Sequence, residues 1–124
     1  MELLIVDDDG IFRKSLEHSL SRQGHQVQTA IHAAEAQRLI KGHCFDGMVC
    51  DVNMPGLDGV GLVQLLRRNG FRPPIVVVSA STDPEVRNQA LEAGASDYFS
   101  KPVHPGRLAS SLCRKSGPVK RYSR

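Results

Sequence analysis

Residues 47–59 read G-M-V-C-D-V-N-M-P-G-L-D-G, and this stretch predicts a buried strand that ends at an acidic residue. The unbroken apolar run over 48–50 is typical of a strand that is covered on both faces. Asp51 follows the run directly, and Pro55-Gly56 then breaks the backbone into a turn. Ligands of open α/β sheets bind at the carboxyl ends of the strands. Asp51 is therefore either a functional carboxylate or a simple turn cap, and its partners decide between the two.

The length and composition of the chain allow one compact domain. A chain of 124 residues with 40% apolar content can bury one core but hardly two. Cys44, Cys50 and Cys113 lack C-x-x-C spacing, which argues against a disulfide framework or a zinc site and favours a reducing cytoplasm. Because no apolar run approaches membrane-spanning length, we expect no association with a membrane.

The net charge of +3 is a property of the last residues and not of the whole chain. Residues 114–124 contain five basic residues and no acid, so the preceding residues are slightly acidic. A short basic end of this kind is more often solvated than a binding arm for nucleic acid. We therefore expect a domain at 1–115 and a disordered basic tail or linker stub at 116–124.

Strand patterns and helix patterns alternate five times along the chain. The predicted strands cover 3–6, 27–31, 48–51, 75–79 and 97–99, and the predicted helices cover 11–23, 33–41, the segment from the Asp58 cap to Gly70, the segment from Asp83 to Gly94, and 106–115. This alternation predicts an α/β fold with a parallel sheet and right-handed crossovers. The second predicted strand alternates in polarity and the fifth is short, so both belong at the edges. The expected fold is a doubly wound (βα)5 sheet of order 2-1-3-4-5, which is flavodoxin-like.

Polar side chains follow four of the five predicted strands and should meet at one edge of the sheet. They are Asp7, Asp8, Asp51, Ser79 and Lys101. Adjacent carboxylates repel one another unless a cation neutralises them, and an oxygen-only ligand set suits Mg²⁺. A carboxylate that attacks phosphorus needs its target neutralised by a metal and a lysine. The set therefore favours phosphoryl transfer with Asp51 as the nucleophile.

Five ordered motifs of this chain resemble the receiver domain of two-component response regulators, over about residues 2–113. They are L-L-I-V-D-D-D, D-V-N-M-P-G-L-D-G, I-V-V-V-S-A, G-A-S-D-Y and K-P, each at its expected strand end. The resemblance implies that Asp51 is the phosphoacceptor. It further implies a Mg²⁺ site in which Asp8 is a direct ligand, Asp7 is mainly a water-mediated ligand and the backbone carbonyl of Asn53 is a third protein ligand.

The same resemblance assigns the remaining site residues. Ser79 and Lys101 would contact the phosphoryl group, Tyr98 matches the aromatic switch position, and the Lys101-Pro102 bond matches a cis peptide. Asp9 is then a peripheral extra acid, and His18, His25, His32 and His43 are interpreted as surface residues.

The resemblance also implies a signalling role and not a turnover enzyme. The phosphoryl donor would be a sensor histidine kinase or a histidine phosphotransfer protein, and phosphorylation would change a partner-binding surface or promote dimerisation. The downstream partner is not indicated, and no DNA-binding region is apparent in the sequence. The chain is either a single-domain regulator or a receiver domain from a longer protein.

Two other classes of protein compete with this interpretation. D-D-D-G-I at 7–11 also fits a haloacid-dehalogenase-type phosphatase with Asp7 as nucleophile, Asp9 as general acid, and Ser79 and Lys101 as later motifs. That family needs further acids after its lysine, whereas no Asp or Glu follows Asp97 here. A dinucleotide-binding module would need G-x-G-x-x-G after the first strand, and this motif is missing.

Overall fold

The computed structural model describes residues 1–54 and 56–122, with side chains described as far as Arg114. The elements follow one another as β1 (Glu2–Val6), α1 (Gly10–Arg22), β2 (Gln26–Ala30), α2 (Ala33–Gly42), β3 (Gly47–Asp51), α3 (Gly59–Arg68), β4 (Ile75–Ser79), α4 (Pro84–Ala93), β5 (Asp97–Ser100) and α5 (Pro105–Tyr122). Every strand is thus followed by a helix, as the sequence pattern predicts.

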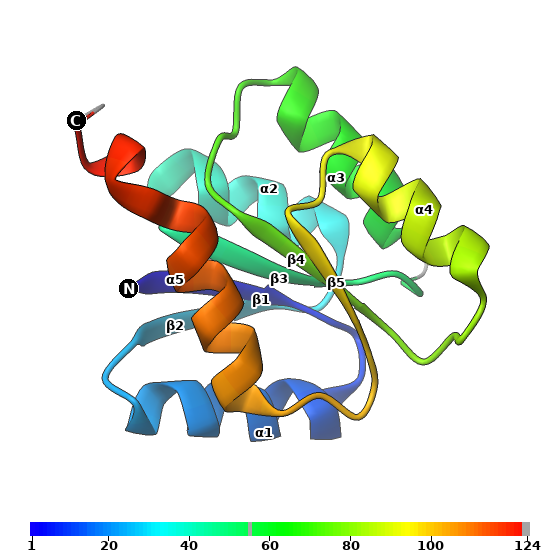
Figure 1. The fold of residues 1–124 in the computed structure, drawn as a ribbon, viewed down its shortest axis with the longest axis horizontal. Helices are drawn as coiled ribbons and strands as arrows, with labels where there is room; N and C mark the ends of the chain where they lie inside the picture. The colour runs from blue at the N-terminus through cyan, green and yellow to red at the C-terminus, as the bar shows by residue number, and fades with distance from the viewer. Residues whose placement is uncertain (55, 123–124) are drawn as a thin grey trace.

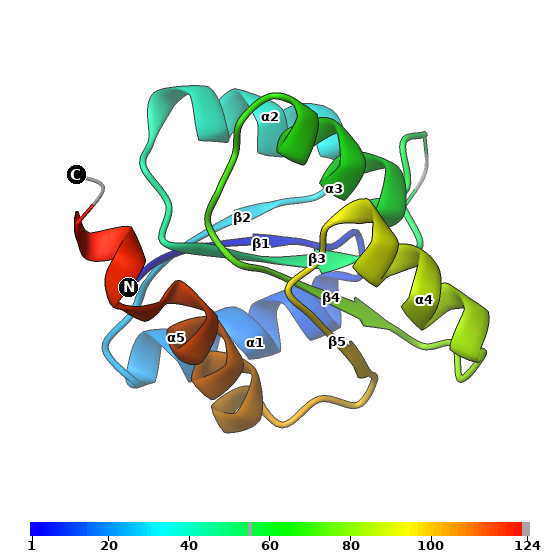
Figure 2. The same cartoon turned by 45° about the horizontal axis from the view of Figure 1, so that its top comes forward.

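The strands form a five-stranded parallel sheet of order β2-β1-β3-β4-β5, which confirms the predicted topology. Helices α1 and α5 cover one face of the sheet, and α2, α3 and α4 cover the other (Figures 1 and 2). The order changes direction between β1 and β3, so the loops that follow these two strands meet at the carboxyl edge, where open α/β sheets bind their ligands.

The central strands are apolar on both faces because each face packs into a different hydrophobic core. In β1, Leu4 and Val6 pack into the core under α2, α3 and α4, whereas Leu3 and Ile5 pack into the core under α1 and α5. All four side chains are fully buried. Burial of a side chain of this size contributes about 1.5–3 kcal/mol, so β1 and its neighbours fix the sheet on which the site is built.

Four helices begin at a side chain that accepts hydrogen bonds from the first turn. The predicted caps are confirmed for α3, where Asp58 accepts from the Gly61 amide at 2.8 Å, and for α4, where Asp83 accepts from the Glu85 amide at 3.0 Å. The cap of α1 is Asp9. The cap of α2 is His32, whose Nδ1 accepts from the Glu35 amide at 3.1 Å.

The Arg67 side chain joins the end of α3 to two neighbouring loops. Its Nε donates to the Gly94 carbonyl at 3.0 Å, and its Nη1 donates to the carbonyls of Phe71 and Pro73 at 2.8 and 2.7 Å. Its Nη2 lies 3.4 Å from the Ser96 hydroxyl oxygen. Gly94 ends α4 in a left-handed conformation with a φ of 119°. One guanidinium therefore fixes the carboxyl end of α4 against α3.

Several element bounds differ from the sequence prediction by a single residue, and two differences change the description of an element. Strand β2 ends at Ala30 and not at residue 31, because the Ile31 amide donates to the Glu35 carboxylate at 2.8 Å and so belongs to the start of α2. The bounds of α5 extend to Tyr122, past the predicted end at 115 and through Gly117 and Pro118.

The extension of α5 to Tyr122 changes the description of the predicted tail at 116–124. Residues 116–122 fall within the bounds of α5, and residues 123–124 lie outside the described part of the chain. A domain boundary near residue 115 stays a prediction.

Pro55, half of the predicted turn after β3, also lies outside the described residues, whereas Gly56 has the positive φ of 80° that a glycine turn requires. Among the described helices, none is long and apolar enough to cross a membrane.

Candidate functional site

Three carboxylates meet at the carboxyl edge of the sheet. The pairing of Val6 with Cys50 places Asp7, which follows β1, beside Asp51, the last residue of β3. Carboxylate oxygens of Asp7, Asp8 and Asp51 lie within 4.8 Å of one another. Asp7 and Asp51 are buried, and Asp8 is exposed. The fold therefore brings together the acids that the sequence predicts for a metal and phosphoryl site.

Lys101 completes this cluster from the loop after β5. Its Nζ donates to Asp7 Oδ2 at 3.0 Å and lies 3.4 Å from Asp51 Oδ1. Its side chain is 17% exposed, and the peptide bond between Lys101 and Pro102 is cis, as the resemblance implies. The lysine is thus in contact with both buried carboxylates.

Burial and the charges of the cluster shift the pKa values of Asp51 and Lys101. Burial and the neighbouring Asp7 carboxylate raise the pKa of Asp51 to about 6, although Lys101 acts in the opposite direction. Burial alone would lower the pKa of Lys101, but the hydrogen bond with Asp7 and the charges of Asp7 and Asp51 outweigh it, so this pKa is raised. The cluster therefore combines three carboxyl groups with one ammonium, a balance of charge that favours a further cation.

The donor set of the cluster fits a hard divalent cation. Its groups are carboxylate oxygens, and the exposed Asp8 gives it a side that water can reach. Mg²⁺ prefers a few carboxylates together with water and phosphate oxygens over a complete protein cage. Asn53 lies two residues beyond β3 with an exposed side chain. The predicted ligand role of its backbone carbonyl stays a prediction.

Ser79 and Tyr98 both contact Ser81, in the loop between β4 and α4. Ser79 ends β4 and is fully buried, and its Oγ accepts from the Ser81 amide at 3.0 Å. The Tyr98 hydroxyl donates to the Ser81 carbonyl at 3.2 Å. The Lys101 amide donates to the Ser79 carbonyl at 2.7 Å. The predicted site and switch residues are therefore linked through one loop.

Sequence reasoning missed three residues that hold the acids in place. Gly59, the first residue of α3, packs so closely on Asp51 that a Cβ would overlap the Asp51 carbonyl oxygen. Arg13 Nη1 donates to the Asp7 carbonyl at 2.8 Å, and the Phe12 ring lies under Lys101. A glycine directly after a helix cap could have signalled close packing, whereas nothing in the sequence relates Phe12 to Lys101.

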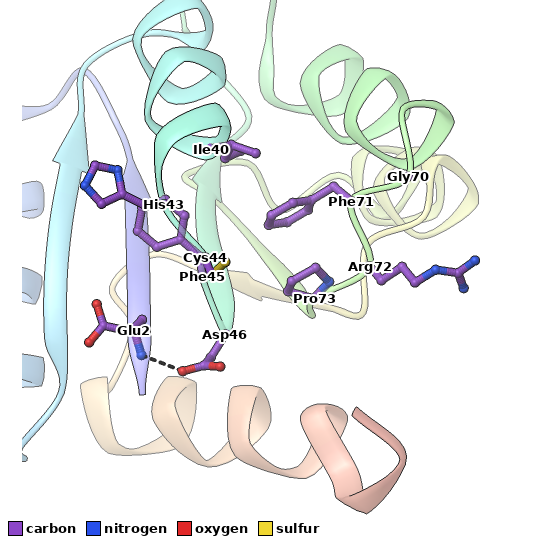
Figure 3. Close-up of a pocket in the computed structure, with 10 residues that line it drawn as sticks. All are labelled: Glu2, Ile40, His43, Cys44, Phe45, Asp46, Gly70, Phe71, Arg72 and Pro73. Carbon is purple, nitrogen blue, oxygen red and sulfur yellow. Dashed lines mark hydrogen bonds between the residues drawn. The ribbon is translucent and has the colours of Figure 1, made fainter. Parts of the chain in front are cut away.

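A hollow lies at the opposite, amino edge of the sheet (Figure 3). Its volume is about 620 Å³, and it lies between the end of α2 and the loops that precede β3 and β4. Its walls include the apolar side chains of Ile40, Phe45, Phe71 and Pro73. None of the predicted site residues lines this hollow.

Comparison with known proteins identifies the family. The family model "Response regulator receiver domain" matches residues 3–112. The chain belongs to the response regulator receiver domain family. The match runs from β1 into α5 and includes the Asp51 and Lys101 motifs. The alternative of a haloacid-dehalogenase-type phosphatase is therefore not supported.

Among its curated relatives, this receiver domain is 44% identical over 118 residues to the transcriptional regulatory protein PrrA of Mycobacterium tuberculosis, which covers 93% of the chain and 51% of the relative. It is 39% identical over 121 residues to the response regulator MprA of Mycobacterium sp. (strain KMS), which covers 95% of the chain and 53% of the relative. The chain spans about half the length of the curated relatives it matches.

Solved receiver domains have the same fold. The receiver domain of the Francisella response regulator 1452 superposes with a TM-score of 0.87 at 28% identity, over 93% of this chain and 95% of that chain. The chemotaxis response regulator CheY4 of Vibrio cholerae superposes with a TM-score of 0.83 at 31% identity, over 92% of this chain and 97% of that chain. Receiver domains are phospho-accepting signalling modules that bind Mg²⁺ at an acidic pocket, and the acid cluster described here has that character.

Proposed function

We propose that Asp51 is the residue of this receiver domain that accepts a phosphoryl group, from a sensor histidine kinase or a histidine phosphotransfer protein. The observation that supports the proposal most is the position of the Asp51 carboxylate. It ends a central strand, is buried beside Asp7, and lies 3.4 Å from the Lys101 ammonium. A carboxylate nucleophile for phosphorus needs this combination of a fixed position and nearby positive charge.

In the proposed step, an Asp51 carboxylate oxygen attacks the phosphorus of a phosphohistidine. The bond from phosphorus to the imidazole nitrogen breaks, its electron pair stays on the imidazole, and an aspartyl phosphate forms. Asp7, Asp8, Asp51 and the Asn53 carbonyl would hold Mg²⁺, which when bound supplies positive charge for the phosphoryl oxygens. The same residues can assist only the formation and hydrolysis of this one bond, so the domain acts as a switch and not as a turnover enzyme.

Lys101 and Ser79 would stabilise the new phosphoryl group. The Lys101 ammonium contacts both Asp7 and Asp51, so a short movement lets it donate to a phosphoryl oxygen. The Ser79 hydroxyl accepts from the Ser81 amide and can donate its own proton toward Asp51. Hydrogen bonds to an ionised acceptor are stronger than neutral ones, so phosphorylation would draw Ser79 toward the phosphate.

The output would be a changed surface over α4, β5 and α5, to which a partner or a second copy binds. Ser81 supports this proposal because it contacts both Ser79 and Tyr98. A movement of Ser79 would displace the Ser81 carbonyl and so release or reorient the Tyr98 ring.

A cytoplasmic location is proposed as well, and the free thiols of Cys44, Cys50 and Cys113 support it.

The test is phosphorylation by acetyl phosphate, followed by intact-mass measurement. The wild-type protein should gain one labile phosphoryl group when Mg²⁺ is present and react far more slowly in excess EDTA. Asp51→Asn should gain none. Asp58→Asn is the matched control, since Asn also caps helices well and α3 should be retained.

Two results would contradict the proposal. One is a labile phosphoryl group that still forms on Asp51→Asn. The other is turnover of many phosphoesters by each protein molecule, which is the behaviour of a phosphatase.

A further inference from the structure

The Phe12 ring lies directly against the Lys101 ammonium. Lys101 Nζ is 4.2 Å from the centroid of the ring. The face of an aromatic ring carries partial negative charge, and a cation within about 6 Å of the centroid is attracted to it. Phe12 is partly buried against the core under α1 and α5, so its ring has a fixed support.

The first turn of α1 holds this ring in register with the acid cluster. Asp9 caps the helix by accepting from the amides of Ile11 and Phe12, and the Asp9 amide donates to Asp7 Oδ1 at 2.8 Å. Arg13, the next residue after Phe12, donates to the Asp7 carbonyl. The Asp9 amide before Phe12 and the Arg13 side chain after it both bond to Asp7, which is itself a partner of Lys101.

Lys101 is the only member of the cluster with a long flexible side chain. An unrestrained lysine has several rotatable bonds and loses much rotamer entropy when it is fixed. Here the ammonium contacts the carboxylates of Asp7 and Asp51 and the face of the Phe12 ring. The ring occupies a position from which water would otherwise compete for the ammonium.

We propose that Phe12 is a positioning residue for Lys101. Its ring face holds the ammonium between Asp7 and Asp51, where it can reach the oxygens of an incoming phosphoryl group. This inference rests on the proposed role of Lys101 in phosphoryl transfer. A residue that only fills the core could be replaced by any apolar side chain of similar size, whereas a positioning role requires an aromatic face. The variants Phe12→Leu and Phe12→Tyr therefore separate these two roles.

The first experiment measures the contact itself, by the proton chemical shifts of the Lys101 ε-methylene group. In the wild-type protein the ring current of Phe12 should move these resonances upfield. Phe12→Tyr should keep the upfield shift and Phe12→Leu should lose it. Phe71→Leu makes the same chemical change at a partly buried phenylalanine of the opposite edge and should keep it. Unshifted resonances in the wild type, or shifts that Phe12→Leu leaves in place, would overturn the inference.

The second experiment measures the rate of phosphorylation by acetyl phosphate at saturating Mg²⁺. Phe12→Leu should react about fivefold more slowly, the size expected when a partly exposed cation–π contact is lost. Phe12→Tyr and Phe71→Leu should both stay within about twofold of the wild-type rate. In a Lys101→Met background, where no ammonium remains to be positioned, Phe12→Leu should cause no further slowing.

Equal rates for Phe12→Leu and Phe12→Tyr would overturn the inference, as would the same slowing by Phe12→Leu with and without the lysine. The chemical-shift measurement needs no phosphoryl transfer. A wild-type protein that gains no phosphoryl group at Asp51 would therefore overturn the proposed function. The chemical shifts of Lys101 would still show whether Phe12 contacts its ammonium.

Discussion

Asp51 occupies a position that disfavours its own ionised form. The carboxylate is buried, Asp7 lies next to it, and its pKa is raised to about 6. In its proposed role Asp51 must nevertheless be ionised to attack phosphorus. The reactive form of Asp51 would therefore be the form that lowers the stability of the fold, as is common in active sites.

A first prediction concerns the stability of the protein without divalent metal. The folded-state pKa of Asp51 lies above the ordinary value of 3.8 for an aspartate, so the folded state binds more protons between these two values. The ionised carboxylate then destabilises the fold, and this loss is complete once the pH has risen through about 6. Asp51→Asn should therefore be more stable than the wild type at pH 7.5 in EDTA, by on the order of 1–2 kcal/mol.

Thermal or urea unfolding at several pH values tests this prediction. The advantage of Asp51→Asn should be roughly halved at pH 5, where most of the folded wild type is already protonated at Asp51. Asp58→Asn, which changes an exposed acid of the next loop, should have little effect at either pH. An Asp51→Asn protein that is less stable than the wild type at pH 7.5 would show that the Lys101 contact outweighs burial and the Asp7 charge.

At the scale of single elements, the start of α3 packs against Asp51, the proposed phosphoacceptor. Gly59 and Gly61 lie in the same turn but face different neighbours. A Cβ on Gly59 would overlap backbone atoms of Asp51, whereas a Cβ on Gly61 would meet mainly the Leu57 side chain, at 2.7 Å from its Cδ1. Leu57 is 41% exposed and can move away, but the end of β3 cannot.

We therefore expect opposite results from the same substitution at these two glycines. Gly59→Ala should destabilise the protein by about 1–3 kcal/mol or more, since overpacking against backbone displaces β3, and should slow phosphorylation of Asp51. Gly61→Ala should be neutral or stabilise by up to about 1 kcal/mol, because alanine favours helix over glycine. Urea unfolding of both variants provides the comparison. Equal stability of the two would refute the close packing of Gly59 on Asp51.

Much of this element-level structure could be predicted from local sequence. The strands could be found because an apolar run that reaches an acid or a hydroxyl marks a buried strand and its carboxyl end, as at Asp51 and Ser79. The caps Asp58 and Asp83 could be found because Asp before an apolar helical stripe is a common start signal. The strand order followed from which strands are apolar on both faces.

The missed features depend on contacts that local patterns do not contain. His32 caps α2 although histidine is not a usual cap residue, and it does so together with Glu35, which accepts from the Ile31 amide. Arg67 lies at the end of a helix, where the sequence indicates an exposed cation. Its guanidinium nevertheless donates hydrogen bonds to carbonyl groups in two other loops. The bounds of α5 pass through Gly117-Pro118, a pair that normally ends a helix.

At the scale of the whole molecule, the acid cluster and the proposed output surface over α4, β5 and α5 occupy different parts of the fold. Asp51 is at the carboxyl edge of the sheet, whereas α4 packs on one face beside α3 (Figure 2). The loop from Ser79 to Asp83 connects the two, and Ser81 in this loop is the shared partner of Ser79 and Tyr98. Any signal between them therefore has a short route that one substitution can interrupt.

Ser79→Ala should separate phosphorylation from output. The variant should still be modified at Asp51, since the nucleophile and Lys101 remain. It should lose most of the response of Tyr98 and of residues 84–93 to beryllofluoride, measured as amide chemical shifts. Ser110→Ala, an exposed serine of α5, serves as the control and should respond as the wild type does. Equal responses in Ser79→Ala and wild type would show that the coupling takes another route.

The hydrogen bonds of Arg67 determine how far each part of α4 can travel in such a response. They fix the carbonyl of Gly94, so any displacement of the helix is a tilt about its carboxyl end. The ten residues of α4 form a lever of about 15 Å, and a tilt of about 10° would move the Pro84 end by roughly 2.6 Å while the Ala93 end stays almost still. A partner seated on the first turn of α4 would therefore detect a large change, and one seated on the last turn would detect almost none.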